Sequence, residues 1–144
     1  MPRVVLDTTV LVSAFLRAVP GGASFELLAS AHAGLLELHL SLDILEETSR
    51  VLLTRKRIRT RYHYPDEAVT RYCQGLAGLS TLTSEVPKLR VVRDPADDMI
   101  LACAVASVAD YLVTRDDDLL SLERYKRIAI VTPEVLLGIL REKR

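Results

Sequence analysis

The sequence predicts an α/β protein with three layers, in which helices cover both faces of a central parallel sheet, as in Rossmann-like folds. Short apolar segments that suit buried strands alternate along the chain with segments of helical periodicity. Acidic residues follow several of these strands directly, at the edge where a parallel sheet places its ligand crevice. The 144 residues are 49% hydrophobic, which is enough for one folded core, so we expect a single domain over residues 1–144.

The first half of the chain alternates between apolar strands and helices. Glycines after Pro20 and at position 34 end the first two expected helices, and the Ser41 side chain suits the cap of the third. On that third helix Glu47 lies at the border of the buried face, whereas Glu46 points away from it. The expected elements are strands at Arg3–Leu6 and Leu36–Leu40, and helices at Thr8–Arg17, Ala23–Ala33 and Ser41–Arg55, with a further helix from Pro65.

The stretch Val91–Leu120 gives the strongest signal in the second half. Asp94 suits a helix cap and Pro95 the first helical position, and the segment after them is apolar almost all round, as in a helix packed on a sheet. A buried strand is expected at Tyr111–Thr114. A last strand at Arg127–Val131 and a helix starting at Thr132–Glu134 complete the pattern. Thr81–Val86 fits either a weak strand or a loop.

Carboxylates fall at strand ends or helix starts throughout this pattern. Converging acids repel one another unless a cation neutralises them, and hard oxygen ligands select Mg²⁺ or Mn²⁺. A metal held in this way polarises a phosphoryl oxygen and activates water. The acids that we expect at the crevice are Asp7, Glu47, Asp97 or Asp98, Asp116 and Asp118.

Each of these acids also has a purely structural interpretation. Asp7 could cap the helix that follows it, and Asp94 with Asp97 could form a capping pair at the helix dipole. Asp116 could begin a short helix, and Glu47 could be an ordinary acid at a helix border. The joint arrangement favours a site, because independent segments place acids at one edge of the sheet.

The net charge is zero, but the charges are segregated along the sequence. Acids dominate the segment 94–118, while residues 50–61 contain basic residues and no acid, an arrangement that suits an anionic polymer held on one surface and cut at a metal. The basic stretch is either plain solvated surface or a set of phosphate contacts with salt-sensitive affinity. Tyr62 and Tyr64 beside it could stack on bases or pack within the fold. The basic residues are Arg50, Arg55, Lys56, Arg57, Arg59 and Arg61.

Cys73 and Cys103 lie on apolar helical faces, which indicates core thiols and fits a reducing cytoplasm. The three histidines lack the spacing of a metal site. No apolar run is long enough for a membrane span, and no signal peptide pattern is present. We therefore expect a cytoplasmic protein without membrane contact.

Three segments together resemble the PIN-domain family, and specifically its short single-domain toxins of toxin–antitoxin modules, the VapC-like ribonucleases. The segments are VVLDTTVLVSAFL, LSLDILEETSRVL and RDPADDMILACAVASVADYLVTRDDDLL, in the order and spacing of the family. The resemblance implies a Mg²⁺- or Mn²⁺-dependent endoribonuclease, a cognate antitoxin as partner, and a homodimer or higher homo-oligomer.

The resemblance also assigns roles to particular residues. It implies Asp7, Glu47, Asp97 and Asp116 as the catalytic acids, with Asp118 beside them as a further metal ligand. Metal binding would fall to Asp7, Asp97, Asp116 and Asp118, with Thr9, Thr114 and Asp98 in support. RNA contacts are expected from Arg55, Lys56, Arg57, Arg59 and Arg115.

Two positions depart from the family pattern. Thr9 stands where the family usually has Asn, which shortens a polar contact near the metal. Arg115 stands where Gly usually precedes the fourth acid, so its side chain either contacts phosphate at the mouth of the pocket or forces a different turn.

Other functions remain as alternatives. One is a PIN-like fold kept as a binding or oligomerisation module without catalysis. A second is a haloacid-dehalogenase-like phosphatase that uses Asp7 as nucleophile, although Thr9 replaces the second aspartate of such enzymes. A receiver domain is disfavoured, since its phospho-acceptor belongs on a middle strand.

Overall fold

The computed structural model describes residues 1–143, and its centre is a six-stranded sheet with the strand order β3-β2-β1-β4-β6-β5. All pairs are parallel except β5 with β6. The strands are β1 (Arg3–Leu6), β2 (Glu37–Ser41), β3 (Thr81–Thr83), β4 (Tyr111–Val113), β5 (Arg124–Tyr125) and β6 (Ile128–Val131). The fold is thus the expected α/β arrangement with a mostly parallel sheet.

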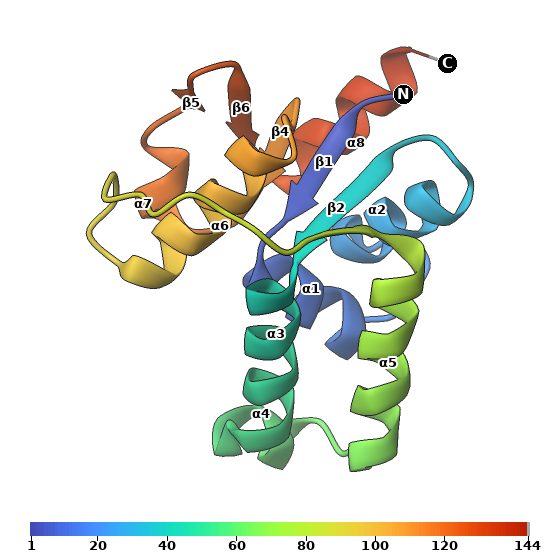
Figure 1. Cartoon of the computed structure of the whole chain (residues 1–144). Helices are drawn as coiled ribbons and strands as arrows, with labels where there is room; N and C mark the ends of the chain where they lie inside the picture. Colours follow the sequence, from blue (N-terminus) through green and yellow to red (C-terminus); the bar gives the residue numbers. More distant parts are fainter. Residues whose placement is uncertain (144) are drawn as a thin grey trace.

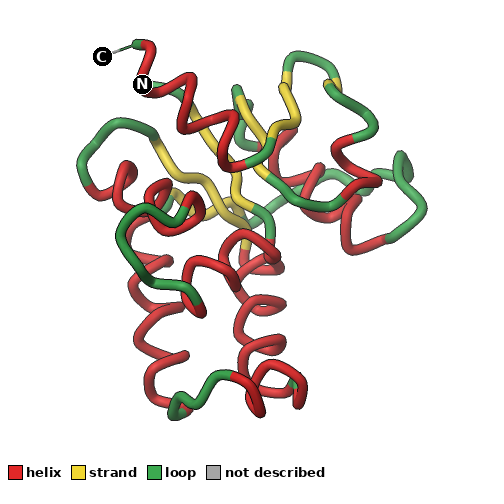
Figure 2. The backbone as a smooth tube through the Cα atoms, turned by 180° about the vertical axis from the view of Figure 1, so that it is seen from behind, coloured by secondary structure: helices red, strands yellow, loops and turns green. Residues whose placement is uncertain are grey.

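Helices flank both faces of this sheet. Helices α2 and α8 contact each other on one face, and α6 crosses β1, β2 and β4 on the other (Figures 1 and 2). Helices α3, α4 and α5 extend from the sheet as an arm (Figure 1). The helices are α1 (Thr8–Leu16), α2 (Ala23–His32), α3 (Leu42–Thr54), α4 (Lys56–Arg61), α5 (Asp66–Leu79), α6 (Pro95–Ala106), α7 (Asp117–Leu120) and α8 (Pro133–Glu142).

The strand order creates a switch point between β1 and β4. The chain passes from β1 outwards through β2 to β3, and then returns through α6 to β4 on the other side of β1. In open α/β sheets a ligand crevice lies beyond the carboxyl ends of the strands at such a point. The core around these two strands is fully apolar, with Val4, Val5, Leu112 and Val113 completely buried.

Most expected elements are confirmed, and the differences lie at the edges of the sheet. The second strand begins one residue later than expected and includes Ser41, which also caps α3 through its side chain. The uncertain segment Thr81–Val86 begins with an edge strand that pairs with β2. The antiparallel strand β5 and the helix α4 within the basic stretch were not expected from the sequence.

The two cysteines are free thiols. Cys103 is completely buried and Cys73 half-buried, so the core interpretation holds for the first and in part for the second. Within residues 1–143, no helix combines the length and the apolar character that crossing a bilayer requires.

Candidate functional site

Asp7 stands at the carboxyl end of β1 and is 1% exposed. Its Oδ1 accepts hydrogen bonds from the amide of Val10 at 3.0 Å and from Thr9 Oγ1 at 2.6 Å, so the residue caps α1. Its Oδ2 accepts a hydrogen bond from the Thr114 hydroxyl. Burial raises the pKa of Asp7 above its usual value, against the effect of these donors, and the charge of Asp116 adds to the rise.

Thr114 joins Asp7 to the loop after β4. The side chain is completely buried, and its Oγ1 accepts a hydrogen bond from the Asp116 amide at 3.0 Å while donating to Asp7. Asp116 in turn caps α7, since its Oδ2 accepts from the Leu119 amide at 3.3 Å. The carboxyl ends of β1 and β4 are therefore linked by one hydroxyl, which fixes the positions of both acids.

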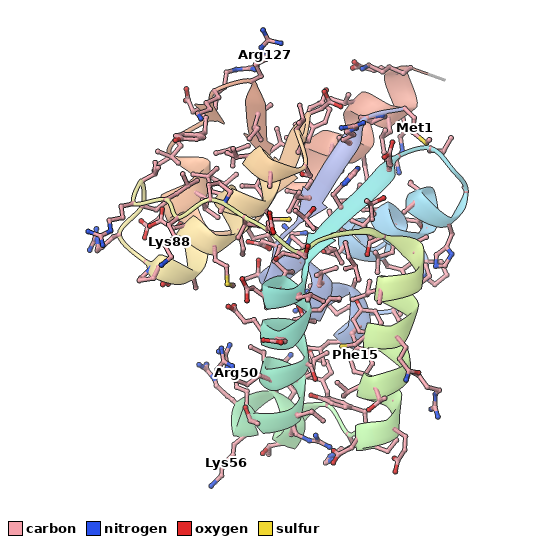
Figure 3. The ribbon with its side chains drawn as sticks, in the orientation of Figure 1. Met1, Phe15, Arg50, Lys56, Lys88 and Arg127 are labelled. Atoms are coloured by element: carbon pink, nitrogen blue, oxygen red, sulfur yellow. The ribbon has the colours of Figure 1, made fainter. Side chains whose placement is uncertain are left out.

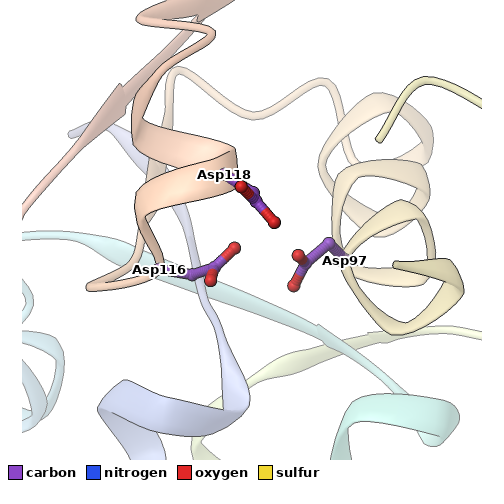
Figure 4. Close-up of side chains that lie close together, drawn as sticks. All are labelled: Asp97, Asp116 and Asp118. Carbon is purple, nitrogen blue, oxygen red and sulfur yellow. The ribbon is translucent and has the colours of Figure 1, made fainter. Parts of the chain in front are cut away.

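Three aspartates converge in front of this link. Within residues 1–143, one carboxylate oxygen from each of Asp97, Asp116 and Asp118 lies within 4.8 Å of the other two. Figure 4 shows Asp97 on α6 pointing towards the two acids carried by α7 and the residue before it. Asp97 follows Asp94, whose side chain caps α6 through the Ala96 amide at 2.9 Å.

Burial and the close approach of these acids together raise the pKa of Asp97. The pKa of Asp97 is raised to about 7, first by burial, then by its contact with Asp116 and by the charges of Asp116, Asp94 and Asp7. No basic side chain is among these causes. All of these causes disfavour the charged form of Asp97, so a bound cation would stabilise the cluster.

A divalent cation fits this set of donors. The three carboxylates supply only hard oxygen ligands, which suit Mg²⁺ or Mn²⁺, and the exposed Asp118 leaves the cluster open to solvent. The pocket also contains a polar atom without a partner, because Thr8 Oγ1 is buried and forms no hydrogen bond within the described residues. Asp7 is not one of the three, and its neighbours already hydrogen bond both of its oxygens.

Asp97 and Asp116 face a groove of about 780 Å³, whereas Asp118 is not among the residues that line it. Glu47 lines this groove from α3, whereas Glu46 is exposed and lies outside it. The remaining walls come from α1, from the start of α6 and from the loop after β4. The expected acids Asp7, Glu47, Asp97 and Asp116 all line the same groove.

Asp98 has a different place. It is 8% exposed, and its Oδ1 accepts hydrogen bonds from the amides of Val91 and Val92 at 2.8 Å each. It lines a second hollow on the other side of the α6 N-terminus. Asp98 therefore holds the segment before α6 in place and does not reach the acid groove.

Arg115 lies at the groove with its guanidinium already paired. Its two terminal nitrogens donate to the carboxylate of Glu134 at 3.0 Å and 2.6 Å. Both residues line the groove, and the pairing with Arg115 lowers the pKa of Glu134. Sequence reasoning placed Glu134 at the start of the last helix and missed it as a groove residue, although that helix follows β6 at the same sheet edge.

The basic arm residues divide into two groups. Arg59 donates to the carbonyls of Leu53 and Tyr64 at 3.2 Å and 3.0 Å and forms an ion pair with Asp66 at 2.8 Å, so it is a structural residue of the arm. Lys56 and Arg57 are exposed, and Lys56 points away from the arm tip (Figure 3). Arg55 lines the groove, as do Arg17 and Tyr62, which the sequence had not singled out as groove residues.

The tyrosines beside the basic stretch also differ from each other. Tyr64 packs edge-on against Phe15, with ring centroids 5.0 Å apart, and its hydroxyl donates to the Leu52 carbonyl at 2.6 Å. These contacts assign Tyr64 to the packing of the arm. Tyr62 is half-buried and remains at the groove.

Comparison with known proteins gives one family and one fold. The PIN domain matches residues 3–118. The structure is similar to that of VapBC2 from Rickettsia felis bound to a DNA fragment from their promoter, with a TM-score of 0.59 and 15% identity over 89% of this chain and 96% of that chain. It is also similar to PAE2754 from Pyrobaculum aerophilum, with a TM-score of 0.63 and 20% identity over 98% of this chain and 90% of that chain. No curated protein sequence matches the chain significantly.

The two structural matches have low sequence identity, so they show a shared fold alone. The sequence match is independent of them and extends from β1 into α7, over far more than half of the chain. It includes every acid of the groove described above except Glu134. On this evidence the chain belongs to the PIN-domain family.

Proposed function

We propose that the protein is a metal-dependent endoribonuclease that hydrolyses RNA phosphodiester bonds with Mg²⁺ or Mn²⁺. The observation that carries the proposal is the convergence of Asp97, Asp116 and Asp118 at the switch point of the sheet. A bound divalent ion would be held by these three carboxylates, with Asp7 behind them. Such an ion polarises a phosphoryl oxygen and lowers the pKa of a bound water.

The residues of the chain have separable tasks in this proposal. Thr114 and the α1 amide of Val10 fix the Asp7 carboxylate, which adds negative charge behind the cluster. Asp97, with its pKa of about 7, carries a proton on its carboxylate in part of the molecules at neutral pH and releases it when a cation binds. We assign to Glu47, which lines the same groove, the task of accepting a proton from the attacking water.

The basic residues at the groove support a polyanionic substrate. Arg17 and Arg55 line the groove next to the acids, and Lys56 and Arg57 extend the positive charge along the arm. Such residues contact phosphates without reading sequence. We assign these positions to the RNA backbone, together with Arg115 once Glu134 releases it.

The physiological role that we propose is that of the toxin in a toxin–antitoxin pair. Its support is the fold shared with VapBC2, and the partner would be a cognate antitoxin that covers the groove. A homodimer, or a higher homo-oligomer, acting in the cytoplasm completes the proposal. These assignments are made by analogy of fold.

The phosphatase alternative is weaker in light of the structure. A nucleophilic Asp7 would have to present an oxygen to the substrate, but the residue is 1% exposed and three donors hydrogen bond its two oxygens. A binding module without catalysis remains the competitor that activity measurements exclude.

The deciding experiment is cleavage of a mixed pool of structured RNAs by the purified full chain, with Mn²⁺, with Mg²⁺ and with EDTA. Asp97→Asn is the test variant, and Asp117→Asn is the matched control, since Asp117 is an exposed neighbour outside the cluster. We expect metal-dependent cleavage that Asp97→Asn abolishes and Asp117→Asn leaves intact. A folded wild-type protein that binds RNA and Mn²⁺ but cuts nothing would favour the binding module.

A further inference from the structure

The first turn of α6 separates two hollows. Asp94, Ala96 and Asp97 line the acid groove, whereas Pro95, Asp98 and Met99 line a second hollow of about 640 Å³. Successive residues of one helical turn thus face opposite sides, as the helical period requires. A helix is only about 10 Å across with its side chains. A polymeric ligand that extends from the acid groove over this turn therefore enters the second hollow directly.

The second hollow combines an apolar lining with a basic rim. Its apolar residues come from α6 and from the segment 86–93 before it, and its basic residues from that segment alone. The apolar residues are Val86, Pro87, Leu89, Val92, Met99 and Ala102, and the basic ones are Lys88, Arg90 and Arg93. The cations suit the phosphates of a single strand, and the apolar lining can bury the face of an unpaired base, although within residues 1–143 it contains no aromatic ring for stacking.

The segment 86–93 has no helix or strand, yet its backbone is tied to the fold. Asp98 accepts hydrogen bonds from the amides of Val91 and Val92, and the side chains of Leu89 and Val92 pack against the main core. These contacts involve the backbone and the inward side chains. They leave the three basic side chains on the outside of a fixed segment.

The three cations are available for a ligand. Lys88, Arg90 and Arg93 are exposed, and within residues 1–143 none of them forms an ion pair or donates a side-chain hydrogen bond. Arg59 and Arg115, by contrast, are engaged with carboxylates. Two acids line this hollow, Asp43 and Asp98. Asp98 accepts hydrogen bonds from two backbone amides, so Asp43 alone is available to balance the three positive charges.

From this juxtaposition we propose that the second hollow is a subsite for single-stranded RNA, which seats an unpaired base beside Met99 and binds its phosphates through Lys88, Arg90 and Arg93. The inference rests on the proposed ribonuclease function and extends it. It gives the RNA a path from the acid groove over the α6 N-terminus.

The test compares two triple variants that remove equal charge. Lys88→Gln/Arg90→Gln/Arg93→Gln changes the subsite, and Arg124→Gln/Lys126→Gln/Arg127→Gln changes the distant β5–β6 turn, whose Arg127 lies at the far end of the molecule from the arm (Figure 3). Binding of a fluorescent single-stranded RNA of twelve nucleotides is measured in EDTA, so that no cleavage interferes. At 0.15 M salt screening acts over about 8 Å, which suppresses the long-range effect of net charge.

We expect the subsite variant to bind RNA about tenfold more weakly, with a salt slope smaller by up to about 2, since each phosphate contact on a single strand contributes about 0.7. The control variant keeps the wild-type slope. Equal slopes in wild type and subsite variant overturn the proposal, even when metal-dependent cleavage by the wild type upholds the proposed function. A wild-type protein that does not bind RNA overturns both.

A second measurement reports on the hollow locally. The chain contains no tryptophan, so Met99→Trp places a single fluorophore in the hollow and Tyr125→Trp places one on β5 as the control. Stacking of a base on the indole should quench Met99→Trp on addition of RNA and leave Tyr125→Trp unchanged. Unchanged fluorescence of Met99→Trp at saturating RNA would exclude a base in this hollow.

Discussion

Thr114 donates a hydrogen bond from its hydroxyl to Asp7, a residue 107 positions earlier in the chain. The same hydroxyl accepts a hydrogen bond from the Asp116 amide, so it contacts both acidic residues directly. Because Thr114 is completely buried, water cannot replace either bond.

Thr114→Val keeps the shape of this side chain and removes its hydroxyl. We expect a loss of about 2 to 3 kcal/mol in the free energy of unfolding, since a buried carboxylate oxygen and a partly buried amide both lose their partner. Thr114→Ser, which retains the hydroxyl, should recover most of that loss. Urea unfolding checks both variants, and a Thr114→Val protein as stable as wild type would show that the link is energetically unimportant.

The pKa of Asp97 predicts how the stability of the metal-free protein depends on pH. The folded protein holds this proton up to about pH 7, whereas the unfolded chain loses it near the ordinary aspartate pKa of 3.8. Between these values the folded state binds more protons, so its stability falls as pH rises. We expect thermal unfolding in EDTA to show this decline in wild type and a weaker decline in Asp97→Asn. A wild-type stability that rises relative to the variant over this interval would contradict the raised pKa.

The same proton should compete with the metal. Mn²⁺ binding requires the charged carboxylate, so its apparent affinity in wild type should increase steeply from pH 6 to pH 8. Calorimetric titration at several pH values measures the affinity together with the protons released. An affinity that does not change over this range would place the cation away from Asp97.

Asp7→Asn tests the buried acid without removing the helix cap. The amide oxygen still accepts from Val10 and Thr9, so we expect a folded protein whose stability changes by about 1 kcal/mol and whose cleavage is abolished. Asp7→Ala removes the cap as well and should be clearly less stable. Circular dichroism and RNA cleavage measured side by side distinguish the two effects, and full activity in Asp7→Asn would remove the residue from the site.

Arg57 and Arg59 are separated by one residue, but we expect Arg57 to bind RNA and Arg59 to stabilise the arm. Arg59→Gln loses two carbonyl contacts, an ion pair and its place over the Tyr64 ring, so the arm should lose about 1 to 2 kcal/mol. Arg57→Gln should keep wild-type stability and reduce both RNA affinity and its salt slope. Unfolding and binding curves of the two variants check this division; a reversed outcome would assign Arg59 to the RNA surface.

The Arg115–Glu134 pair is exposed, and this limits its value for stability. We expect Glu134→Gln to change the free energy of unfolding by less than about 1 kcal/mol, because solvent screens the pair. RNA binding should respond more strongly. Glu134→Gln frees the Arg115 guanidinium at the groove and should tighten RNA binding, whereas Arg115→Gln should weaken RNA binding. Binding in EDTA measures both, and weaker binding by Glu134→Gln would contradict this role for the pair.

Much of the fold follows from local sequence signals. The helices α3, α6 and α8 have a serine, aspartate or threonine cap whose side chain makes the predicted hydrogen bond. The strands β1 and β4 are short apolar runs, and the acids after them mark the carboxyl edge. Convergence at that edge was predictable because parallel strands share it.

The missed features depend on contacts that no local pattern encodes. Helix α4 has no side-chain cap and no buried residue, and Arg59 anchors it through bonds to residues outside the helix. Glu123 just before β5 and Lys126 in the β5–β6 turn have positive φ, where glycine or asparagine would have given a turn signal. The choice between Asp97 and Asp98 also needed the structure, because the orientation of the α6 N-terminus decides which acid faces the groove.

The placement of β4 beside β1 has a consequence for protein synthesis. Residues 4–6 leave the ribosome well before their partners at 111–113 and the outer strand at 128–131. Until then the nascent chain holds Asp7 without Asp97, Asp116 or Asp118 beside it. The proposed nuclease site therefore cannot assemble before the strand at 128–131 has been translated.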